Sequence, residues 1–206
     1  EREKVKFFKT HSSLCKMYDS NFTDLKNTLG SIYIVRDPRN VVTSLAHHYD
    51  LSVDQATNVM IDKDRLMDKT DKNCRVFLGS WSFNYNSWKN LQNQKKYLLI
   101  KYEDLISKKK TTMLKILKFI ESIGLNDFKL NMNKLNKVIK TTEFEKMKEL
   151  EKKKEFKEAV LDPKTKKRKV FFKLGPRNNW RNILDLKNVR IIEDSFQKEM
   201  SELGCL

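Results

Sequence analysis

The chain has 206 residues, and its 43 Lys and Arg against 27 Asp and Glu give a formal net charge of +16 at pH 7. This length suits a single domain with a substantial core. No apolar run approaches the roughly 20 residues that cross a bilayer, and no signal-peptide pattern is present, which argues against a membrane protein. The three cysteines, Cys15, Cys74 and Cys205, are scattered without metal-ligand spacing, which favours reduced thiols in a cytoplasmic protein.

Short apolar runs predict buried parallel strands at residues 5–8, 32–35 and 97–100. Apolar residues at helical spacing predict helices over residues 21–29, 38–49, 76–92, 111–123 and 187–203. Between residues 140 and 181 the periodicity weakens, and we expect long functional loops there. Alternating strands and helices predict one α/β domain over residues 1–206, a three-layer sandwich with a central parallel sheet.

The most informative segment is residues 32–44, Ile-Tyr-Ile-Val-Arg-Asp-Pro-Arg-Asn-Val-Val-Thr-Ser. The predicted strand ends at Arg36, and a helix start follows at once, because Asp37 suits the N-cap and Pro38 the first helical position. This junction brings positive charge and free backbone N–H groups to the carboxyl edge of a sheet. Open α/β sheets bind phosphorylated ligands at that edge, so the segment predicts an anion pocket.

Asn40 and Ser44 lie one turn apart on the same predicted helix, so the amide and the hydroxyl share one face. Both groups can contribute to the anion pocket. An alternative remains open at this point, since an arginine at such a junction also serves to pair with a carboxylate.

The segment resembles the 3′-phosphate-binding region of the sulfotransferases that use 3′-phosphoadenosine 5′-phosphosulfate (PAPS). In that family a strand ends in Arg, a Ser eight residues later shares the 3′-phosphate, and Arg36 and Ser44 have this spacing. The resemblance implies a P-loop NTPase-like sulfotransferase fold, with PAPS as donor and adenosine 3′,5′-bisphosphate (PAP) as product. Further segments look like family motifs in the family's order: 5–11 (Val-Lys-Phe-Phe-Lys-Thr-His), 97–104 (Tyr-Leu-Leu-Ile-Lys-Tyr-Glu-Asp), 142–147 (Thr-Glu-Phe-Glu-Lys-Met) and 172–182 (Phe-Lys-Leu-Gly-Pro-Arg-Asn-Asn-Trp-Arg-Asn).

The resemblance also implies roles for single residues. His11 would be the general base for the acceptor, a role that suits imidazole because it titrates near neutral pH. Lys9 would help to neutralise the transferring sulfate. The 3′-phosphate would be bound by Arg36, Ser44, Lys173, Leu174 and Gly175, and adenine by Tyr102, Thr142, Phe144 and Trp180.

The chain departs from the family pattern in two places. Leu174 replaces a cation, while Pro176 and Asn178 stand where the family varies or has glycine. Two outcomes are open: the phosphate affinity of this loop is reduced, or Arg177 or the lysines of residues 164–169 supply it. The sequence also contains no Pro-Lys-Ser-Gly-Thr-Thr loop for the 5′-phosphosulfate. We therefore expect an N-terminally incomplete domain that does not turn over by itself.

The sequence predicts a sulfotransferase that acts on a hydroxyl or amine of a small-molecule acceptor, without a metal or a membrane. Two alternatives are a non-catalytic PAP/PAPS-binding relative and a basic nucleic-acid-associated protein. Only charge supports the second alternative, chiefly the tract 164–169, and we expect no specific nucleic-acid partner because no helix-turn-helix, zinc or RNA-binding motif is present. The same tract suits a loop that closes over an anionic cofactor. A homodimer is left open.

Overall fold

The computed structural model describes the whole chain except residues 1–4, 18, 69–73, 126–129, 154–169 and 174. Its centre is a parallel pair of strands, β3 (Ser31–Val35) and β6 (Tyr97–Lys101). Parallel strands need a long crossover, and here it contains three helices. These are α1 (Pro38–Tyr49), α2 (Val53–Ile61) and α3 (Trp81–Lys89).

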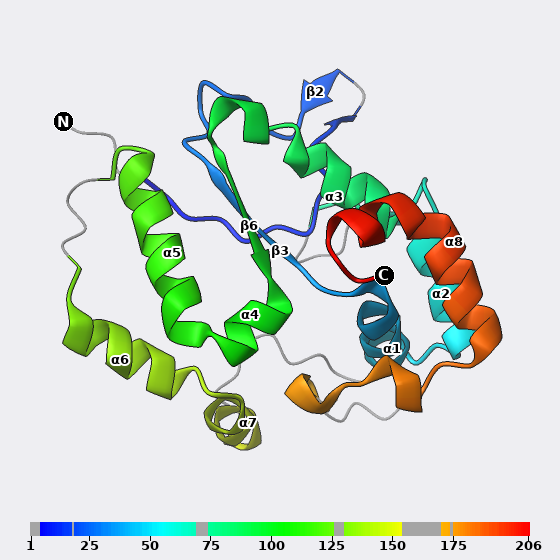
Figure 1. Cartoon of the computed structure of the whole chain (residues 1–206). Coiled ribbons are helices and arrows are strands. Elements are labelled where there is room, and N and C mark those ends of the chain that lie inside the picture. The colour runs from blue at the N-terminus through cyan, green and yellow to red at the C-terminus, as the bar shows by residue number, and fades with distance from the viewer. Residues whose placement is uncertain (1–4, 18, 69–73, 126–129, 154–169, 174) are drawn as a thin grey trace.

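Helices lie on both sides of the strand pair, as the expected sandwich requires (Figure 1). On one side are α5 (Lys109–Ser122), α6 (Met132–Thr141) and α7 (Phe144–Lys152), and on the other are α1, α2, α3 and α8 (Leu186–Glu202). The short helix α4 (Tyr102–Ser107) follows β6 directly. None of the helices in the described ranges is long and apolar enough to span a bilayer. The remaining elements are two short antiparallel pairs, β1 (Lys16–Met17) with β2 (Ser20–Asn21) and β4 (Leu66–Met67) with β5 (Val76–Phe77), and the 3-10 turns η1 (Gln92–Gln94), η2 (Gly175–Arg177) and η3 (Trp180–Asn182).

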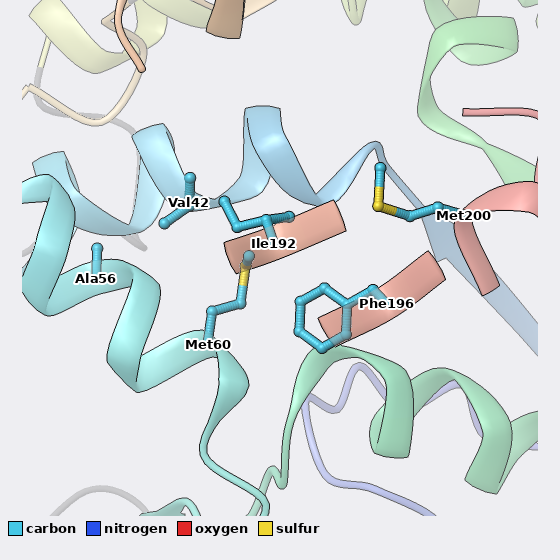
Figure 2. Packing of buried hydrophobic residues seen from close by; sticks show 6 residues of the cluster. All are labelled: Val42, Ala56, Met60, Ile192, Phe196 and Met200. Atoms are coloured by element: carbon cyan, nitrogen blue, oxygen red, sulfur yellow. The ribbon is translucent and has the colours of Figure 1, made fainter. Parts of the chain in front are cut away.

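The main hydrophobic cluster joins α1, α2 and α8 (Figure 2). Its members are all at most 3% exposed, namely Val42, Ala56, Met60, Ile192, Phe196 and Met200. A second cluster of Val35, Tyr85 and Leu203 connects β3 with α3 and the end of α8. The C-terminal helix therefore fixes α1 against the sheet, and α1 begins where the predicted anion pocket lies.

The predicted junction after β3 is confirmed. Helix α1 begins at Pro38, and the carboxylate of Asp37 accepts a hydrogen bond of 2.9 Å from the backbone N–H of Arg39. This contact satisfies one of the unpaired N–H groups of the first turn. The strands predicted at 32–35 and 97–100 and the helices predicted at 111–123 and 187–203 also agree with the structure to within a few residues.

Three predicted elements are wrong. Residues 5–8 form no strand, because they pair with no described strand, and Phe7 and Phe8 are 73% and 85% exposed. Residues 21–29 form no helix: Asn21 ends β2 and residues 25–27 form a turn, where Asp24 accepts hydrogen bonds from the backbone and side chain of Asn27 and so competes with a helix.

The predicted helix 76–92 is a short strand, β5, followed by the shorter helix α3. Gly79 adopts a φ of +62° and Ser80 caps the helix, so the helix begins only at Trp81. The expectation of long loops over 140–181 is also partly wrong, because α7 is a regular helix. The basic tract 164–169 lies outside the described residues.

Candidate functional site

The register of the parallel strands brings Arg36 and Tyr102 together. Val35 is opposite Lys101 at the last paired position, so the next residue of each chain emerges at the same edge. The guanidinium carbon of Arg36 lies 4.2 Å from the centre of the Tyr102 ring. Two residues that the sequence assigned to one cofactor are therefore in direct contact, in a cation–π pair.

The Arg36 guanidinium is only partly satisfied by the protein. One terminal nitrogen, Nη2, donates to the carbonyl oxygen of Gly175 at 3.3 Å. The Nε atom is buried and has no hydrogen-bond partner among the described residues, and within the same residues no carboxylate forms an ion pair with Arg36. A buried, unsatisfied donor on a cation is costly unless a ligand meets it, so this residue fits a bound anion.

Gly175 connects this arginine with the predicted adenine segment. Its φ is +50°, and a Cβ atom placed on it would lie 2.0 Å from the Phe144 ring at the start of α7. The centre of the Phe144 ring in turn lies 5.9 Å from the centre of the Phe172 ring, and the two rings are edge-on. Only glycine permits both the backbone conformation and this close approach.

Asn40 and Ser44, which the spacing places on one face of α1, both contact the segment 175–182. The side-chain oxygen Oδ1 of Asn40 accepts a 2.9 Å hydrogen bond from the backbone N–H of Trp180. The exposed Ser44 hydroxyl donates to the Asn40 carbonyl at 3.3 Å and accepts from Asn178 at 3.1 Å. The loop therefore lies directly over the first two turns of α1.

Two guanidinium groups contact Trp180. The guanidinium carbon of Arg39 lies 4.2 Å from the ring centre and that of Arg181 lies 4.4 Å from it. Arg39 is 6% exposed, forms a paired contact with Asp37 at 2.8 and 3.0 Å, and also binds Glu193. Burial alone would lower the pKa of Arg39, but the hydrogen bonds to the two carboxylates outweigh it and raise the pKa.

Lys173 and Thr142 have local partners. The ammonium of Lys173 lies 3.3 Å from Nδ1 of His47, and Thr142 donates its hydroxyl hydrogen to the carbonyl of Val138 at 2.8 Å. Both residues are exposed. Among the described residues no hydrogen bond or ion pair joins Lys173 or Thr142 to Arg36, and Leu174 lies outside the described residues.

Lys9 and His11 lie on an irregular segment before β1 whose backbone contacts α3, and both are exposed. Asn84 donates one hydrogen bond of 3.1 Å to the carbonyl of His11 and accepts another of 2.9 Å from the Tyr33 hydroxyl on β3. The next residue, Ser12, accepts from the Trp88 indole at 2.8 Å. The backbone of His11 is thus fixed beside β3, although residues 5–8 do not form the predicted strand.

A family model for the sulfotransferase domain matches residues 1–204. The chain belongs to the sulfotransferase family. Sulfotransferase 2A1 of Macaca fascicularis is 26% identical over an alignment of 206 positions, which covers 98% of this chain and 66% of that relative. Human sulfotransferase 2A1 is 24% identical with the same coverage. The predicted family is therefore confirmed.

Solved structures show the same fold. Mouse sulfotransferase SULT7A1 complexed with PAP has a TM-score of 0.58 at 23% identity, over 83% of this chain and 58% of that one. Retinol dehydratase in a complex with retinol and PAP also has a TM-score of 0.58, at 18% identity, over 83% of this chain and 47% of that one. This sulfotransferase-family chain thus spans about two thirds of its curated relatives and about half of these solved chains.

Sequence reasoning missed two residues of the candidate site. Arg39 supports Trp180 and Asn178 contacts Ser44, but neither was assigned a role in the pocket. Both partners are more than 130 residues away in the chain, so no local pattern identifies them. The only available signal was the departure from the family motif at Asn178.

Proposed function

We propose that this protein binds PAP and PAPS at the carboxyl edge of β3 and β6 and transfers a sulfuryl group to a hydroxyl or amine of a small-molecule acceptor. The observation that carries the proposal is the half-buried Arg36, whose buried Nε atom is an unsatisfied donor beside Tyr102 and Gly175. Arginine presents a planar fork of donors that suits phosphate. Arg36 and Ser44 would bind the 3′-phosphate, with Lys173 and the backbone of Gly175 beside them.

The adenine ring would be bound mainly by Tyr102 and Phe144. The Tyr102 ring contacts the Arg36 guanidinium, which donates to the carbonyl of Gly175, and the Phe144 ring lies against Gly175. Thr142 would contribute from the end of α6. Because two guanidinium groups already contact Trp180, we propose that it serves the nucleotide chiefly by fixing the loop.

His11 would act as the general base. PAPS supplies the sulfuryl group: the acceptor oxygen bonds to sulfur, the bond from sulfur to the 5′-phosphate oxygen breaks, and the acceptor's proton goes to the His11 imidazole. Lys9, two residues before, would stabilise negative charge on the transferring group. We further propose that the protein is a single domain, that it is located in the cytoplasm and that its acceptor is a small molecule.

The first test is the affinity for PAP, measured by calorimetry at physiological salt. We expect micromolar binding that Arg36→Ala weakens by about tenfold or more, because charge-assisted hydrogen bonds to phosphate are lost. Arg190→Ala is the matched control, since Arg190 is an exposed arginine on α8. Lack of binding by the unmodified protein would contradict the proposal.

The second candidate is a PAP-binding relative without activity. The ammonium of Lys173 already lies 3.3 Å from Nδ1 of His47, which favours a weaker phosphate site than the family motif implies. The two candidates differ in sulfation of a simple phenol from PAPS, measured in a protein that also carries a 5′-phosphosulfate loop, because residues 1–206 alone are not expected to turn over. Turnover that disappears in His11→Ala supports the enzyme, whereas PAP binding without turnover supports the relative, and turnover at full rate in His11→Ala contradicts His11 as the base.

A further inference from the structure

Asn178 occupies an unusual position for an amide side chain. It is 7% exposed and faces three groups of α1. Its Nδ2 atom lies 3.0 Å from the carbonyl of Asn40, 2.8 Å from Oγ1 of Thr43 and 3.1 Å from Oγ of Ser44. Its Oδ1 atom accepts from the Thr43 hydroxyl at 3.0 Å. The buried amide is thus fully satisfied, as burial of a polar group requires.

The hydrogen bonds around Ser44 allow its hydroxyl group to turn and donate its hydrogen bond to a ligand. A serine hydroxyl has one donor and two acceptor positions, and Asn178 occupies one acceptor position. The hydrogen itself is directed to the Asn40 carbonyl at 3.3 Å, the longest contact in the group. That carbonyl also accepts from Nδ2 of Asn178 at 3.0 Å, so it remains satisfied if Ser44 turns away.

Direct binding of a ligand by Asn178 is disfavoured by the same geometry. Its Nδ2 atom has two hydrogens and already faces three oxygen atoms within 3.1 Å. The side chain is also buried, in contrast to the exposed Ser44. An effect of Asn178 on a ligand must therefore pass through Ser44.

We propose that Asn178 is a positioning residue for the 3′-phosphate: it holds Ser44 Oγ through an acceptor position and leaves the hydroxyl hydrogen for the phosphate. This inference rests on the proposed function. It also gives a role to a side chain that stands where the resembled family motif has glycine, which offers no such group.

The test is a double-mutant cycle on PAP affinity with Asn178→Ala, Ser44→Ala and the double variant. We expect Asn178→Ala alone to weaken PAP binding by about fivefold, which corresponds to one hydrogen bond, and to have little further effect in the Ser44→Ala background. Asn182→Ala is the matched control, because Asn182 is an exposed asparagine of the same loop. Asn178→Asp keeps the side-chain size but replaces the donor by an acceptor, and we expect it to weaken binding more than Ala.

A phosphorus NMR spectrum of bound PAP separates positioning from a general loss of structure. We expect Asn178→Ala and Ser44→Ala to move the 3′-phosphorus resonance in the same direction and to leave the 5′-phosphorus resonance in place. Equal effects of Asn178→Ala with and without Ser44, or unchanged affinity in both Asn178 variants, overturn the inference. Lack of PAP binding by the unmodified protein instead overturns the proposed function.

Discussion

Gly175 illustrates how one residue governs the geometry of this site. Its carbonyl accepts from Arg36, its φ is +50°, and its Cα side faces the Phe144 ring without room for a methyl group. The residue thus joins the end of β3 to the start of α7. Any side chain here must move Phe144 or the loop, and either movement changes the contact with Arg36.

We predict that Gly175→Ala lowers the free energy of unfolding more than Gly124→Ala, which is the matched control. Gly124 also has a positive φ, +96°, but no atom lies within 4 Å of a Cβ placed there, so only backbone strain of about 1 kcal/mol is expected. Urea unfolding of both variants measures the difference. Adding Phe144→Ala to Gly175→Ala should cost less than the sum of the single changes, because it removes the clash. Additive costs would contradict this explanation.

At the scale of elements, the N-terminus of α1 connects the strand, the loop and the C-terminal helix. Asp37 caps α1 and binds the Arg39 guanidinium, which also contacts Glu193 on α8 and the ring of Trp180. The capping residue therefore also holds the cation that supports the loop over the site. Loss of Asp37 should affect more than one element.

We predict that Asp37→Ala lowers the free energy of unfolding by about 3 kcal/mol, because the helix loses its cap and a buried guanidinium loses a partner. Ser52→Ala is the comparison. Ser52 caps α2 in a capping box and is exposed, so about 1 kcal/mol is expected. Thermal or urea unfolding gives both values, and an equal cost for the two changes would show that the Arg39 contact is not stabilising.

At the scale of the whole molecule, α8 closes the fold by contacts with α1, α2 and α3. Besides the hydrophobic cluster of Figure 2, Glu202 on α8 accepts from the Tyr85 hydroxyl at 2.9 Å and pairs with Lys89, both on α3. The hydrogen bond from Lys89 is the largest cause that lowers the pKa of Glu202 below its ordinary value of 4.5. Burial, followed by the contact with Glu202, raises the pKa of Tyr85, which therefore stays protonated as the donor.

This contact predicts a pH-dependent stability. A carboxylate whose pKa is lowered by folding stabilises the native state above pH 4.5, and the contribution is lost as the pH falls below that value. Because the side chain is 38% exposed, we expect Glu202→Gln to cost about 1 kcal/mol at pH 7 and much less at pH 3. Urea unfolding at the two pH values tests this, with Glu121→Gln, an exposed residue of α5, as control. The same cost at both pH values would contradict the prediction.

Local sequence signals determined the junction at the centre of the site. The apolar run of β3, the cap at Asp37 and the proline at position 38 act within a few residues, so the strand, Arg36 and α1 were predicted with nearly correct bounds. The spacing of Arg36 and Ser44 and four further motifs in order were sufficient for the family. The helix predicted over 76–92 failed because pairing of β5 with β4 and the positive φ of Gly79 outweighed the aromatic periodicity.

Only the tertiary structure decided which groups surround Arg36 and Ser44. Arg36 meets Gly175 from 139 residues away, and Asn178 reaches Ser44 across 134 residues. Such contacts depend on how α1, the loop and α8 pack, and hydrophobic packing is not encoded in any short pattern. The sequence by itself determined the family and the position of Arg36 directly after β3, whereas the partners that orient Arg36 and Ser44 became visible only once the chain was folded.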